Sequence, residues 1–194
     1  MSKSALTKEQ FEQYLCKALS LATDAISYFE LFYFLLSLSQ KKKYEMIFKK
    51  HHRILNFIKR AVHDDLVLSL HKLLEDAKNP VSVNRCISMA LQLSLISRDE
   101  QQSLRKMANE VKPICLKVGV LRNQLIAHRD SSISAGAIFN DAKISPKELR
   151  CLALTYGRIL DVLVRAYGKK SFDLDNYSNG LSKEIEALMD DLLN

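Results

Sequence analysis

Glycine and proline are scarce in this chain of 194 residues, which has 5 glycines and 3 prolines. These are the residues that separate strands and form tight turns, whereas leucine, lysine, serine and alanine are abundant and favour helices. The fractions of hydrophobic residues, 47 %, and of charged residues, 26 %, are those of an ordinary globular protein. We therefore expect an all-α protein with a sizeable core.

The chain also lacks the paired ligands of metal and redox sites. No two of its cysteines form a C-x-x-C pair, and no two histidines form an H-x-x-x-H pair. We predict no metal and no cofactor. Because free cysteine is usually buried, we predict that four residues are small core residues in a reducing cytoplasm: Cys16, Cys86, Cys115 and Cys151.

A secretory signal is missing from the N-terminus, where no basic region precedes an apolar run. The most apolar segment, residues 28–38, is interrupted by Glu30 and is short for a bilayer. We expect a soluble, cytoplasmic protein with no membrane partner.

Positive charge is in surplus. The chain has 29 lysines and arginines against 22 acidic residues, a formal charge of +7. A basic protein of this kind can bind a polyanion such as RNA or DNA, although many only have a solvated cationic surface. Lys49, Lys50 and Arg53 form a local positive patch with two histidines. This patch is either a solvated elbow between helices or a surface that contacts phosphates.

Apolar spacing and capping residues predict the helices. Capping residues precede four of them, at Thr7, Ser82, Ser97 and Ser145. The first helix is apolar around most of its second half, so it should be buried at the centre of a bundle or against a second subunit. The expected helices cover roughly residues 8–39, a short segment before 53, then 53–76, 83–95, a helix from 98, 114–128 after a break near Pro113, 146–167, and a last one from about 181.

Two parts of the chain are expected. Residues 1–170 should form the helical bundle, and residues 171–194 an acidic C-terminal helical arm packed on the bundle or on a partner. A polar linker over residues 169–180 should precede the last helix, whose predicted apolar stripe is Leu181, Ile185, Leu188 and Leu192.

The segment V-G-V-L-R-N-Q-L-I-A-H-R-D, residues 118–130, has the side chains for phosphoryl chemistry. His128 can take a proton from a ribose 2′-hydroxyl or give one to a leaving oxygen near neutral pH. Arg122 offers a planar, permanently charged fork to phosphate oxygens, and Asn123 can orient either group.

The spacing of these residues limits how they can act together. Arg122 and His128 are six residues apart, which is about 9 Å of rise and roughly 120° of rotation on a regular helix. Either the helix is distorted near its end, or two copies of the motif face each other across a dimer, which we prefer. The alternative is an arginine in a surface ion pair and a histidine that caps a helix end.

The motif L-R-N-Q-L-I-A-H-R-D resembles the signature of the HEPN superfamily, an arginine followed after four to six residues by a histidine. The upstream run A-V-H-D-D-L-V-L-S-L-H-K-L-L-E-D and the following N-P-V-S-V also resemble HEPN proteins of abortive-infection and toxin systems. The resemblance covers roughly residues 53–167. It implies a bundle of four to five core helices with additional N- and C-terminal helices, a homodimer, and metal-independent cleavage of RNA.

Carried over by matching residue, the resemblance makes Arg122, His128 and Asn123 catalytic. Our hypothesis is a HEPN-type endoribonuclease, a toxin or antiphage effector with RNA as substrate and a possible cognate antitoxin or regulatory protein. Four further residues are expected to bind the RNA backbone: Arg129, Lys49, Lys50 and Arg53. The alternative is a non-catalytic dimeric module that binds RNA or protein, and a DNA-binding regulator ranks last because no recognition helix is evident.

Overall fold

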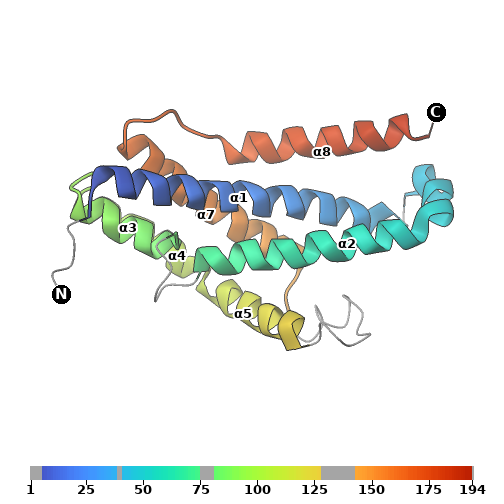
Figure 1. Cartoon of the computed structure of the whole chain (residues 1–194), viewed down its shortest axis with the longest axis horizontal. Coiled ribbons are helices and arrows are strands. Elements are labelled where there is room, and N and C mark those ends of the chain that lie inside the picture. The colour runs from blue at the N-terminus through green and yellow to red at the C-terminus, as the bar shows by residue number, and fades with distance from the viewer. Residues whose placement is uncertain (1–5, 39–40, 75–80, 128–142, 194) are drawn as a thin grey trace.

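The computed structural model describes residues 6–38, 41–74, 81–127 and 143–193 (Figure 1). Within these ranges the regular structure is helical and contains no strand. The prediction of an all-α protein is therefore confirmed. The elements are α1 (Lys8–Ser37), the 3₁₀ turn η2 (Lys42–Tyr44), α2 (Glu45–Leu74), α3 (Val83–Gln92), α4 (Arg98–Glu110), α5 (Lys112–Ala127), α7 (Pro146–Ala166) and α8 (Leu174–Asp191).

The helix starts lie where the capping residues predict them. Thr7, Ser97 and Ser145 each form a complete capping box, and the Ser82 hydroxyl accepts a hydrogen bond from the Arg85 backbone N–H. Each cap satisfies backbone donors that have no partner inside the helix. At the other end of α7, Gly168 has a φ of +86°, the left-handed conformation that commonly ends a helix.

Helix α1 is the centre of the bundle. It packs against α2, α7, α8 and α3, and Figure 1 shows it between α2 and α8. Its aromatic side chains Phe11, Phe29 and Phe32 are almost completely buried. The expectation that the second half of this helix is buried on several sides is confirmed, and its neighbours are helices of the same chain.

By length and composition alone, α1 is also apolar enough to cross a membrane. In its most apolar 18-residue window, 44 % of the residues are buried inside the protein. Core helices of soluble proteins meet the same criterion, because a helix buried on all sides needs an apolar surface. The expected absence of a membrane partner therefore remains a prediction.

Helix α2 joins the two helices that were expected around residue 53. It spans Glu45–Leu74 in two helical parts, because His51 has non-helical angles, φ −118° and ψ 19°, and forms a kink between them. The predicted elbow exists as this kink. Ile54, three residues after the kink, is 57 % exposed.

The C-terminal helix differs from the expectation. It begins at Leu174, with Asp173 as its cap, so the predicted linker is helical over its second half. Its buried residues are Leu174, Ser178 and Met189, whereas Leu188 is exposed. The predicted stripe is wrong in its C-terminal half, because α8 turns a partly polar face, with two serines, toward the bundle. Of that stripe Leu181 and Ile185 are half-buried, while Leu192 is exposed like Leu188.

A buried carboxylate explains that polar face. Glu30 of α1 is 6 % exposed and accepts hydrogen bonds from Ser178 and, at 2.8 Å, from Ser182 of α8. Arg150 of α7 donates to the same carboxylate at 3.2 Å. Serine hydroxyls on α8 therefore serve as donors to a charge that would otherwise be costly to bury.

The cysteines are only partly core residues. Cys86 is fully buried, and burial raises the pKa of its thiol to about 12, so it is an inert core residue. Cys16 and Cys151 are exposed, which corrects the prediction for these two. Each of these cysteines has apolar neighbours in sequence, but its own position is on the solvent-facing side of its helix.

Candidate functional site

Helix α5 carries the motif, and a proline defines its start. Helix α4 ends at Glu110, Val111 forms the turn, and α5 begins at Lys112 with Pro113 in its first turn. Proline fits there because its missing N–H would have no partner at a helix start. The predicted break near Lys112 is confirmed, and it gives α5 its own direction alongside α2 (Figure 1).

The inner face of α5 fixes its rotation. Val118 and Leu121 are completely buried, and α5 packs mainly against α2. On the other side, Leu116 is 68 % exposed and Val120 is 46 % exposed. The helix is therefore anchored by one apolar stripe and presents a second, partly apolar face to solvent.

Arg122 and Asn123 are on the surface next to this anchor. Arg122 is half-buried, and its Nη1 donates to Asn123 Oδ1 at 3.2 Å. Within the described residues this is the one polar contact of the Arg122 side chain, and no carboxylate pairs with it. Its guanidinium therefore keeps most of its donors for an external anion. The neighbouring Gln124 buries its Oε1 without a hydrogen-bond donor from the described chain.

His128 and Arg129 lie outside the described residues, as does the loop predicted after them up to residue 142. The helices on either side of this segment are linked at some distance from it. Lys117 of α5 pairs with Glu148 of α7 at 2.5 Å. This bond, together with the backbone N–H of Ser145, lowers the pKa of Glu148 below its ordinary value of 4.5. The carboxylate therefore stays charged at neutral pH and fastens the start of α7 to α5.

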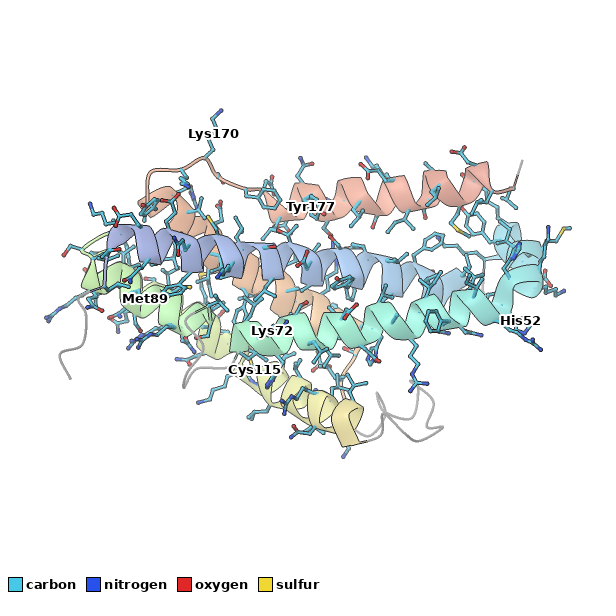
Figure 2. The ribbon with its side chains drawn as sticks, in the orientation of Figure 1. His52, Lys72, Met89, Cys115, Lys170 and Tyr177 are labelled. Atoms are coloured by element: carbon cyan, nitrogen blue, oxygen red, sulfur yellow. The ribbon has the colours of Figure 1, made fainter. Side chains whose placement is uncertain are left out.

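The other expected RNA-binding residues are in a different place. Lys49, Lys50 and Arg53 flank the kink of α2, and Lys49 forms an ion pair with Glu45 at 2.6 Å. Figure 2 shows His52 at the end of the molecule, beyond the C-terminal end of α5. The fold does not bring this patch next to Arg122. If this patch contacts RNA, it contacts nucleotides other than those bound at Arg122.

No group of three or more metal-ligating side chains occurs among the residues that the structure describes. His63 is buried and its Nδ1 contacts Asp64 at 3.1 Å, whereas His71 lines a surface pocket on the same helix. The expected absence of a metal and of a cofactor remains a prediction.

One feature near the motif was not predicted from the sequence. A pocket of about 470 Å³ lies beside α5, between that helix and parts of α2, α3, α4 and α7. Its lining comes from five helices, so no local sequence pattern could have located it. Gly119 is the one local signal of this pocket in the sequence, because a glycine inside a helix lowers its stability and usually has a packing or functional role.

Comparison with known proteins places the chain in a family. A family model described as AbiU2, one of the HEPN families, matches residues 7–188, nearly the whole chain. Searches among curated proteins and among solved structures found no match. The match includes α1 and most of α8, so the family unit extends over both parts into which the sequence was divided.

Proposed function

The chain belongs to the AbiU2 family of HEPN domains, and from this premise we propose that it is a metal-independent endoribonuclease of an abortive-infection or toxin system. Membership supports the abortive-infection context, because the family is named for it. The observation that carries the catalytic part is the state of Arg122. It is half-buried at the surface, and within the described residues it contacts only Asn123 and has no carboxylate partner.

The reaction follows from the chemistry of these groups. His128 takes the proton of a ribose 2′-hydroxyl, and the 2′-oxygen attacks the adjacent phosphorus. The bond from phosphorus to the 5′-oxygen breaks, and that oxygen receives a proton. The products are a 2′,3′-cyclic phosphate and a 5′-hydroxyl. Arg122 stabilises the negative charge that builds on the phosphate oxygens, and Asn123 holds the guanidinium in place.

A homodimer would complete this site. Val120 exposes much of its side chain on the helix that carries the motif. On α2, which packs against α5, Phe57 is 71 % exposed. Burial of such side chains against a second copy would stabilise a dimer and bring two motifs together. Sedimentation velocity tests this proposal: the wild type should sediment as a dimer, and Val120→Asp should shift it to the monomer.

The activity can be tested in cells and with purified protein. Wild type should inhibit growth and degrade RNA, whereas His128→Ala should do neither. Arg98→Ala removes an exposed arginine on α4 and serves as a matched control that should retain both properties. If His128→Ala keeps the cellular effect, the chain is a non-catalytic module that binds RNA or a partner protein, such as an antitoxin.

A further inference from the structure

The pocket beside α5 lies on the face of the helix that carries Arg122 and Asn123 of the motif. We call it the α5 pocket, and Cys115, one of its lining residues, is labelled in Figure 2. Cys115, Gly119 and Arg122 are at positions i, i+4 and i+7, which share one face of a helix. Its lining residues are His71, Leu74, Asn84, Ala108, Asn109, Lys112, Cys115, Leu116, Gly119 and Tyr156.

The distance along the helix from this pocket to the motif is short. Gly119 precedes Arg122 by three residues and Asn123 by four, which corresponds to about 4.5 and 6 Å of rise. Both motif side chains are therefore direct surface neighbours of a residue that lines the α5 pocket. A ligand that fills the pocket would extend toward the guanidinium of Arg122.

Gly119 has no packing role within the described chain. A Cβ atom built at this position would meet no atom within 4 Å. Glycine inside a helix lowers the stability of the helix compared with alanine, and no packing contact within the described chain requires a glycine here. A glycine is useful where a ligand must come close to the helix backbone, and the open space at Gly119 faces the α5 pocket.

The lining of the α5 pocket has the chemistry of a nucleotide site. Leu74, Ala108 and Leu116 form apolar walls, and two amides, Asn84 and Asn109, can bond to the edge of a base. Lys112 is an exposed cation at the rim, and His71 and Tyr156 add polar groups to the wall. No carboxylate is among the described lining residues, so an anion meets no repulsion from them.

A second cleft, between α1, α7 and α8, makes a useful contrast. Its volume is about 580 Å³, and it has cations too, but it is also lined by the carboxylates of Glu30 and Glu186. Glu186 already neutralises Lys41 there, at 2.8 Å. The α5 pocket is therefore better suited to a phosphate-bearing ligand, and it is the one adjacent to Arg122.

We propose that the α5 pocket binds one nucleotide of the RNA substrate beside the phosphate that is cleaved. The base enters between the apolar walls, the asparagine amides bond to its edge, and Lys112 binds a backbone phosphate. The proposal rests on the proposed ribonuclease function, and it assigns Gly119 the role of keeping the pocket open toward the motif.

Gly119→Leu is the decisive variant, because a Cβ atom at this position meets no described atom within 4 Å and a leucine would extend from there into the opening of the α5 pocket. Gly180→Leu on α8 is the matched control, since a Cβ there also meets nothing within 4 Å. The probe is a fluorescein-labelled 2′-fluoro RNA of about 12 nucleotides, which fits a typical single-strand site and lacks the attacking hydroxyl. Affinity is measured by fluorescence anisotropy, and cleavage is measured on the unmodified RNA.

Gly119→Leu should weaken binding and slow cleavage at least about tenfold, the effect of losing one bound base. Lys112→Ala should weaken binding severalfold and reduce the slope of log affinity against log salt by about 0.7, the value for one phosphate contact. Gly180→Leu should leave both properties unchanged. Circular dichroism confirms that each variant is folded.

Three outcomes would overturn the proposal. If the wild type cleaves RNA and Gly119→Leu is folded and equally active, the subsite assignment is wrong and the ribonuclease function stands. If the wild type neither binds nor cleaves RNA, the proposed function itself fails. If Gly119→Leu changes the sedimentation of the protein but not its RNA affinity, this face is an interface between copies of the chain.

Discussion

Two helical glycines should respond to alanine in opposite ways, because one faces open space and the other faces a leucine. At Gly119 of α5, an added Cβ meets nothing within 4 Å in the described structure. At Gly157 of α7, it would lie 2.0 Å from Leu174 Cδ1 of α8. The helix preference for alanine is the same at both sites, so the difference between them reports the contact with α8.

The magnitudes follow from these contacts. Gly119→Ala should raise the free energy of unfolding by about 1 kcal/mol, and the melting temperature of a chain of this size by about 2–4 °C. Gly157→Ala gains the same helix preference but overpacks against Leu174, at a cost of about 1–3 kcal/mol. Its net effect should be a loss of about 1 kcal/mol.

Urea denaturation followed by far-UV circular dichroism gives both values. The double variant Gly157→Ala with Leu174→Ala should recover part of the loss, so the two changes should be coupled. The reasoning is refuted if Gly157→Ala stabilises the chain as much as Gly119→Ala does. It is also refuted if Gly119→Ala destabilises it, since the face of α5 would then be packed against something.

Three further predictions concern the helix ends and the polar contacts. Glu30→Ala should lower the free energy of unfolding by about 1–3 kcal/mol, because Arg150 and two serines lose a shared acceptor. Amide hydrogen exchange in α8 should become faster, and an unchanged exchange rate in α8 would contradict this prediction. Glu148 has a lowered pKa, so its pair with Lys117 stabilises the fold above about pH 4.5 and loses this effect as the pH falls further. Glu148→Gln should flatten the acid limb of a stability-against-pH curve, and superimposable limbs would argue against the pair. Ser97→Ala should cost about 1 kcal/mol in a urea titration through loss of its capping box, and no loss would mean that the cap is dispensable.

Local signals predicted the fold well where they act within one helix. Thr7, Ser97 and Ser145 fixed three helix starts because a capping box depends only on residues three positions apart. The start of α8 was misplaced because the sequence before Leu181 is polar. Ser178 is buried and Ser182 is half-buried there, and both donate to Glu30, a residue far away in sequence.

The candidate site was predicted in part. Arg122 and Asn123 could be identified from a motif, and the structure adds that Arg122 lacks a carboxylate partner within the described residues. The α5 pocket could not be predicted, because His71 and Tyr156 reach it from helices that are distant in sequence. The elbow around His52 looked similar to a phosphate-binding patch in sequence, and only the fold shows that His52 lies at the end of the molecule, away from α5 (Figure 2).

The most direct test of the account is the chemistry of the cleaved RNA ends. Wild type, Arg122→Ala and Arg122→Lys are each incubated with total RNA in excess chelator, and the new termini are mapped. We expect 2′,3′-cyclic phosphate ends with wild type, a rate about 100-fold lower with Arg122→Ala, and partial activity with Arg122→Lys. Cleavage that stops in chelator and returns with magnesium, or that is equally fast in Arg122→Ala, would contradict it.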